Sequence, residues 1–106
     1  MIANEEILKI KDAIISAVDV EKLYLFGSYA YGTPSKDSDY DFYMVIPNNS
    51  GMRPIDATVK ARSALWGIKR KPIDIVAGTV DGFARRCTAP TLERKIAREG
   101  VILYER

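Results

Sequence analysis

The chain has 106 residues, 47% hydrophobic and 28% charged, a balance that is typical of a globular domain and excludes a disordered chain. Its 16 basic and 14 acidic residues give a formal charge of +2, too even to predict binding to nucleic acid or to a membrane surface. One cysteine and no histidine exclude an intramolecular disulfide, a thiolate or imidazole zinc site and histidine-based catalysis.

The length predicts a single domain that spans residues 1–106. The first residues are acidic where a signal peptide is basic, and no apolar run reaches the roughly 20 residues of a membrane span. We therefore expect a cytoplasmic protein without membrane contact. Basic clusters such as Arg85–Arg86 and Arg94–Lys95 are interpreted as solvated faces.

The first third of the chain predicts a helix, a strand and a short helix. Asn4 is a suitable N-cap, and an apolar stripe at helical spacing follows it through Ile7, Ile10 and Ile14. The β-favouring run at 22–26 predicts a strand that ends at Gly27. A sharp turn and a short helix over 28–32 are expected to follow. Residues 33–38 are polar and predict a loop.

The remainder alternates strands and helices. Residues 39–46 predict a strand with Asp39, Asp41, Tyr43 and Val45 on one face and Tyr40, Phe42, Met44 and Ile46 on the other. A helix follows from Pro54 to near Gly67, carrying Ile55, Val59, Ala61, Leu65 and Trp66. A strand at 73–76, short helices capped by Thr79 and Thr91, and a last strand at 101–104 complete the pattern. This order predicts an α/β or α+β class, with a mixed sheet flanked by helices.

Two known motifs do not fit the glycine segment and the aspartates. Gly27 and Gly32 have the spacing of P-loop glycines, but the lysine and serine or threonine that must follow are replaced by Thr33–Pro34. An EF-hand loop is excluded because Phe42 stands where its sharp-turn glycine belongs.

Three aspartates remain as candidate metal ligands. Asp39 and Asp41 share one face of a predicted strand, about 6.5 Å apart, so their carboxylates can converge on two ions ~3.5–4 Å apart. Asp74 lies in another apolar run, where a carboxylate is expected to be paired or metal-bound. Each feature has a plain structural alternative: a turn at Gly27–Ser28, a solvated strand end at the Asp pair, and an edge-strand charge at Asp74. Their joint occurrence favours a magnesium site.

Three segments, at residues 26–32, 38–42 and 73–76, resemble the signature of the DNA polymerase beta-type nucleotidyltransferase superfamily, and more narrowly that of the minimal nucleotidyltransferases. The resemblance implies a polymerase beta-like fold. Members with Gly-Ser, ten residues and Asp-x-Asp are commonly antitoxins encoded beside a HEPN-domain ribonuclease toxin, and they modify a toxin tyrosine with AMP.

The resemblance also implies a role for each residue. Gly27 and Ser28 would hold the β and γ phosphates of ATP or another nucleoside triphosphate, and Asp39 and Asp41 would ligate two Mg²⁺ ions. Asp74 would share the catalytic ion and accept the proton of the incoming hydroxyl. Tyr31 stands where the family commonly has arginine, which removes a cation that could neutralise the triphosphate.

The implied function is Mg²⁺-dependent transfer of AMP to a tyrosine of a HEPN-domain partner. The sequence leaves two alternatives open. The first is a weak or inactive antitoxin that acts by complex formation, and the second is an enzyme that modifies a small molecule of the aminoglycoside type. Nucleic acid is not an expected partner, and a homo-oligomer is compatible with the sequence.

Overall fold

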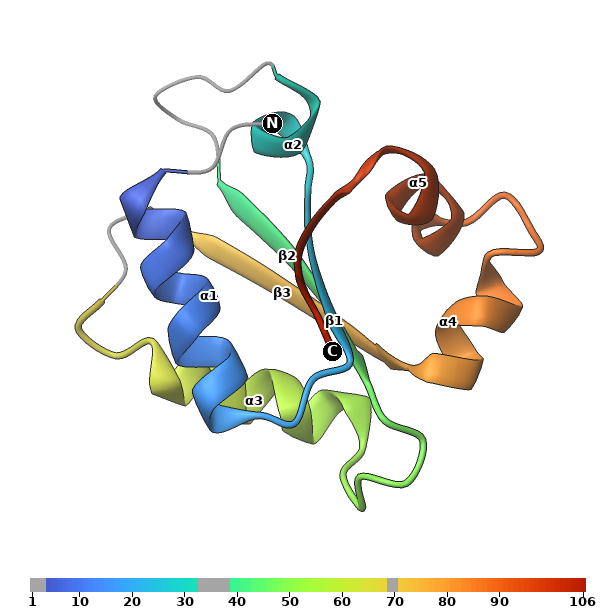
Figure 1. Ribbon diagram of the computed structural model, residues 1–106, viewed down its shortest axis with the longest axis horizontal. Helices are drawn as coiled ribbons and strands as arrows, with labels where there is room; N and C mark the ends of the chain where they lie inside the picture. Colours follow the sequence, from blue (N-terminus) through green and yellow to red (C-terminus); the bar gives the residue numbers. More distant parts are fainter. Residues whose placement is uncertain (1–3, 33–38, 69–70) are drawn as a thin grey trace.

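A mixed sheet lies at the centre of the computed structural model, which describes residues 4–32, 39–68 and 71–106 (Figure 1). In these ranges the sheet has four strands in the order β3-β2-β1-β4, namely β1 (Lys22–Phe26), β2 (Tyr40–Ile46), β3 (Ile73–Thr79) and β4 (Val101–Glu105). β2 and β3 pair in parallel, and β1 pairs antiparallel with both β2 and β4. The predicted fold class is confirmed, while the predicted loop at 33–38 lies outside the described residues.

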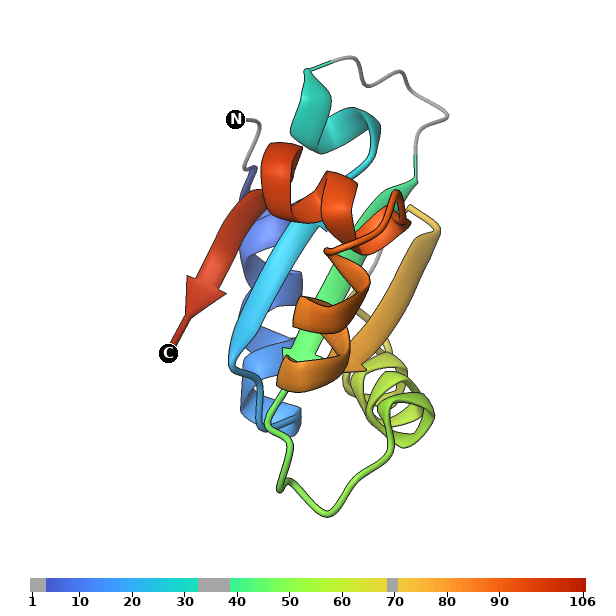
Figure 2. The same ribbon diagram turned by 90° about the vertical axis from the view of Figure 1, so that its right-hand side faces the viewer.

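Helices cover both faces of the sheet. One face packs against α1 (Glu5–Ala17) and α3 (Pro54–Ala64), and the other against α4 (Val80–Arg86) and α5 (Leu92–Glu99) (Figure 2). The short helix α2 (Ser28–Tyr31) follows β1 at one end of the sheet. Across the described ranges, no helix is both long and apolar enough to cross a membrane.

The start of α1 agrees with the sequence prediction. The Asn4 side chain accepts a hydrogen bond of 2.8 Å from the Ile7 amide, which satisfies one of the amides that a helix start leaves unpaired. Ile7, Ile10 and Ile14 are fully buried against the sheet. The predicted apolar stripe is therefore confirmed.

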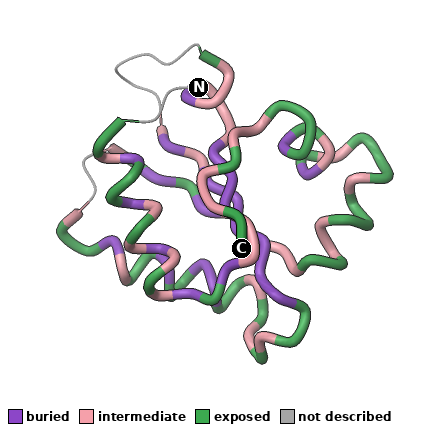
Figure 3. Tube along the Cα trace, in the orientation of Figure 1, coloured by how far each residue is buried: buried purple, intermediate pink, exposed green. Residues whose placement is uncertain are grey.

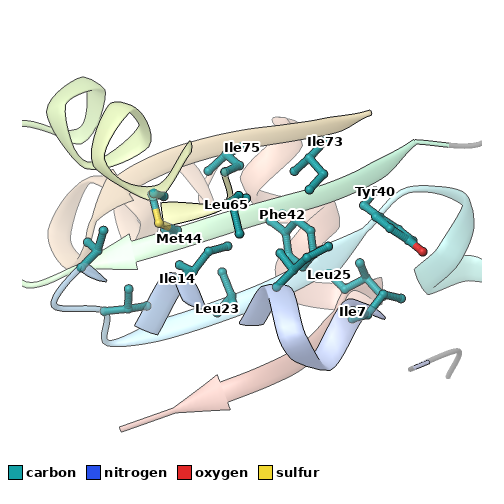
Figure 4. Packing of buried hydrophobic residues seen from close by; sticks show 14 of the residues in the cluster. Ile7, Ile14, Leu23, Leu25, Tyr40, Phe42, Met44, Leu65, Ile73 and Ile75 are labelled. Carbon is teal, nitrogen blue, oxygen red and sulfur yellow. The ribbon is translucent and has the colours of Figure 1, made fainter. Parts of the chain in front are cut away.

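The alternation in β2 separates the two cores. Tyr40, Phe42, Met44 and Ile46 belong to the main cluster with α1 and α3 (Figure 4), whereas Tyr43 and Val45 belong to a smaller cluster on the opposite face. β2 is buried along nearly its whole length (Figure 3), as expected for an inner strand covered on both faces. The face that carries Tyr43 also carries Asp41, two residues earlier.

Helix α3 buries only some of the apolar residues of this part of the chain. Ala57, Thr58 and Ala61 face the protein, whereas Ile55, Val59 and Trp66 are 60%, 59% and 92% exposed. The inner face of the helix therefore consists of small side chains, while its larger apolar residues point outward. The helix itself ends at Ala64, with Leu65 as its buried C-cap.

Candidate active site

The predicted site residues come together at one end of the sheet. Phe26, the last residue of β1, lies opposite Asp41 in the antiparallel pair, and Asp41 lies opposite Asp74 in the parallel pair. The end of β1 and the starts of β2 and β3 therefore lie at the same end of the sheet. Gly27, directly after β1, is brought to the same place as the two aspartates.

Two features, the backbone conformation and the contact with Asp41, restrict position 27 to glycine. Its φ is 77° and its ψ is −161°, a region that is essentially restricted to glycine. A Cβ atom at this position would overlap the Asp41 Oδ2 atom. The turn is secured by the amides of Ala30 and Tyr31, which both donate to the Gly27 carbonyl at 3.0 Å. The sequence predicted the turn, but not that the backbone of Gly27 lies against a carboxylate.

The electrostatics of Asp41 reflect a crowded acidic site. Burial raises its pKa to about 6, with further contributions from the negative charges of Asp74 and Asp39 and from a side-chain hydrogen bond with Asp74. A hydrogen bond between two carboxyl groups requires a proton on one of them. Both groups can be ionised together at neutral pH only against repulsion, which a nearby cation would relieve.

The three aspartates differ in exposure. Asp39 lies directly before β2 and is partly buried, as is Asp41, whereas Asp74 is exposed as the second residue of β3. Asp74 thus lies in an apolar run of the sequence, as predicted, but its side chain faces solvent. Ile73 and Ile75 enter the main core, but the opposite face of this strand is open at its first residues.

The donor set fits a hard divalent cation. Carboxylate oxygens are the ligands that Mg²⁺ prefers, and Asp41 and Asp74 present them side by side. Within the described ranges, no three acidic side chains gather closely enough to form a complete metal site. A bound nucleotide phosphate and water would have to supply the remaining ligands, as is usual for Mg²⁺.

A second group of polar residues lies on the same face, and the sequence did not indicate it. The Tyr43 hydroxyl donates to Glu93 Oε2 at 3.0 Å, and Arg86 pairs with the same oxygen at 3.4 Å. Burial, followed by the hydrogen bond with Glu93, raises the pKa of Tyr43. Strand alternation placed Tyr43 on this face, but only the packing of α5 could identify Glu93 as its partner. The network fastens α4 and α5 to the sheet beside the aspartates.

A mixed sheet with helices on both faces, in which a glycine–serine turn meets aspartates of two adjacent strands, defines a nucleotidyltransferase-like domain. Residues 8–106 match the family model described as Polymerase beta, Nucleotidyltransferase, and the chain belongs to this family.

Two solved structures share the fold. A nucleotidyltransferase-family protein of Sulfolobus solfataricus is 19% identical with a TM-score of 0.65, over 96% of this chain and 79% of that one. A toxin–antitoxin structure with AMP-PNP is 22% identical with a TM-score of 0.57, over 97% of this chain and 75% of that one. No curated protein sequence matches the chain.

Proposed function

We propose that the chain is a Mg²⁺-dependent nucleotidyltransferase that transfers AMP from ATP to a hydroxyl acceptor, a tyrosine of a HEPN-domain toxin. The observation that carries the proposal is the position of Asp41, which lies against Gly27 on one side and beside Asp74 on the other. A phosphate held at the Gly27–Ser28 turn would lie next to the carboxylates that hold the cation. Nucleotidyl transfer requires this proximity, because the reacting phosphate must bind the cation and the protein together.

Each residue has a distinct role in the proposed reaction. Gly27 and Ser28 would hold the β and γ phosphates, and Asp39 and Asp41 would hold two Mg²⁺ ions, whose charge would stabilise the phosphate oxygens. Asp74 contributes to the same metal site and accepts the proton of the acceptor hydroxyl. The hydroxyl oxygen then bonds to the α-phosphorus, and the bond to the leaving pyrophosphate breaks. The exposure of Asp74 supports its role as base, since an acceptor from a partner protein must reach it from solvent.

Three observations support the proposed reaction, substrate and partner. Family membership supports the reaction class. The fold neighbour described as a toxin–antitoxin with AMP-PNP supports an adenine nucleotide and a toxin partner. The exposure of Asp74 at one end of the sheet supports a protein acceptor, because a side chain of another protein can reach this carboxylate from solvent.

A binding-only antitoxin is the second candidate, and the surface of α3 favours it. Ile55 and Val59 on this helix, and Trp66 just after it, expose large apolar side chains, and exposed apolar surface commonly marks a protein interface. In this case the chain neutralises its partner by occlusion, and the aspartates are dispensable.

A transfer assay with the neighbour-encoded protein as acceptor tests the proposal. The purified pair is incubated with Mg²⁺ and ATP labelled at the α-phosphate, and the acceptor is then examined by mass spectrometry. We expect one or more AMP groups on a tyrosine, and loss of more than about a hundredfold in rate on Asp41→Asn or Asp74→Asn. Asp12→Asn is the matched control, because Asp12 is exposed on α1.

The two candidates give opposite results. Absence of label with the wild-type chain, together with neutralisation that survives Asp41→Asn, supports the binding-only antitoxin and refutes the transferase. Label on a small molecule in the absence of the partner would refute the protein acceptor while keeping the reaction class.

A further inference from the structure

A lysine of α5 lies across an aromatic ring next to the proposed phosphate turn. The Lys95 ammonium is 5.0 Å from the centroid of the Tyr31 ring, a distance at which a cation is attracted to the face of an aromatic side chain. Tyr31 is the last residue of α2, and the two helices lie next to each other in Figure 2. The contact joins segments 64 residues apart in the sequence, so no local pattern indicates it.

The contact with Tyr31 places this ammonium on the short helix that begins at Ser28. Ser28 and Tyr31 are three residues apart in α2, and residues at this spacing on a helix are neighbours, with Cβ atoms about 5–6 Å apart. A lysine side chain has a flexible four-carbon stem, which allows its ammonium to change position. Lys95 can therefore leave the ring for a phosphate held at the turn.

Among the described residues, the neighbour of the Lys95 ammonium is an aromatic ring rather than a carboxylate. Within the described ranges no carboxylate forms an ion pair with it, and its recorded contact is the Tyr31 ring, which attracts a cation without neutralising it. Lys95 also lines a hollow of about 490 Å³ together with Arg94 and Arg98, with Glu99 as its acidic member. Three cations against one anion leave a positive potential at this hollow, from which Lys95 reaches the Tyr31 ring of α2.

We propose that Lys95, held over Tyr31, is a nucleotide-binding residue that contacts the terminal phosphate of the bound nucleoside triphosphate. The proposal rests on the proposed function, because it takes the Gly27–Ser28 turn as the phosphate site. A contact between an ammonium and a phosphate oxygen is charge-assisted and stronger than a neutral hydrogen bond. Lys95 thus makes the site prefer a triphosphate to a diphosphate or monophosphate.

Equilibrium binding tests the proposal without any partner protein. The affinities for AMP, ADP and a non-hydrolysable ATP analogue are measured with Mg²⁺ by isothermal titration calorimetry. Lys95→Ala is expected to weaken binding of the ATP analogue about tenfold and to leave AMP binding unchanged. Lys95→Arg is expected to retain most of the affinity, and Tyr31→Phe to retain it as well, because each keeps a cation over an aromatic face.

Arg98→Ala is the matched control, since Arg98 belongs to the same helix and lines the same hollow. It is expected to change the affinity less than about twofold, as is usual for an exposed charge. Equal losses with Lys95→Ala and Arg98→Ala would overturn a specific contact in favour of a general positive field. A Lys95→Ala protein that binds all three nucleotides like the wild type would also overturn the proposal.

Failure of the proposed function gives a different result. If Asp41→Asn abolishes Mg²⁺-dependent binding while Lys95→Ala has no effect, the phosphate site stands and only the role of Lys95 is refuted. If the wild-type chain binds none of the nucleotides, the proposed function itself is refuted. Lys95 is exposed, so its replacement by alanine within a helix should leave folding intact, which a thermal melt verifies.

Discussion

Replacing Asp41 by asparagine should stabilise the metal-free protein at neutral pH. The folded chain raises the pKa of Asp41 from 3.8 to about 6, so ionising this group opposes folding. At full strength this difference corresponds to about 3 kcal/mol above pH 6. Because Asp41 is only partly buried, solvent screening reduces the expected cost to about 1–2 kcal/mol. Asp41→Asn should therefore raise Tm at pH 7 by about 5–10 °C.

The sign of the effect fixes its pH dependence. Below pH 3.8 the carboxyl group is protonated in both folded and unfolded chains, and asparagine offers no advantage. Between pH 3.8 and about 6 the folded chain retains a proton that the unfolded chain has released, so the stability of the wild type falls as the pH rises. The stability difference between variant and wild type should grow through this window and remain constant above it.

Thermal unfolding in EDTA from pH 4 to pH 8 measures this difference. Asp12→Asn, at an exposed position of α1, should show no such pH-dependent gain. Mg²⁺ at about 100 times its Kd should then add about 2.7 kcal/mol to the unfolding free energy of the wild type and much less to that of Asp41→Asn. The stability difference between the two proteins should therefore become smaller or change sign. A metal-free variant that is no more stable than the wild type at pH 7, or a difference independent of pH, would refute the reasoning.

Three further substitutions test other features of the molecule. Gly27→Ala should destabilise by about 1–3 kcal/mol and abolish Mg²⁺-dependent nucleotide binding, because its methyl group displaces the Asp41 carboxylate at a strained φ; wild-type binding by calorimetry would contradict this. Tyr43→Phe should cost about 1–3 kcal/mol in urea unfolding by removing a donor from buried Glu93, and an unchanged midpoint would oppose it. Trp66→Ser should change stability by less than about 0.5 kcal/mol, since this side chain is 92% exposed; a larger loss would mean that it packs against the protein.

The sequence predicted those parts of the fold that depend on neighbours in the chain. The Asn4 cap, the β2 alternation and the caps at Thr79 and Thr91 all follow from residues one to four apart, and all are present. The burial of α3 did not follow in the same way. Ile55 and Val59 have the helical spacing of an inner face, but Ala57 and Ala61 have the same spacing and are the residues that face the protein.

The site, too, combines features that nearby residues in the chain predict with features that depend on tertiary packing. The spacing of Asp39 and Asp41 placed them on one strand face, but the pairing of Asp41 with Asp74 required the parallel register of β2 and β3. Likewise Tyr31 suggested a missing cation, whereas the structure brings Lys95 to its ring from α5. Contacts of this kind are set by how helices and strands pack, and one sequence alone does not specify that packing.

The order of the strands in the sheet also gives the two halves of the site different local stabilities. β3 pairs only with β2 in the described part of the chain, so Asp74 is carried by an edge strand while Asp41 is carried by an inner one. Edge strands open more readily than inner strands, and their amides exchange with solvent in local fluctuations rather than in global unfolding. Amides of β3 should therefore exchange faster than those of β2. Each local opening of β3 moves the Asp74 carboxylate away from Asp41. A nucleotide or partner that bridges Asp41 and Asp74 would slow this exchange and hold the site closed.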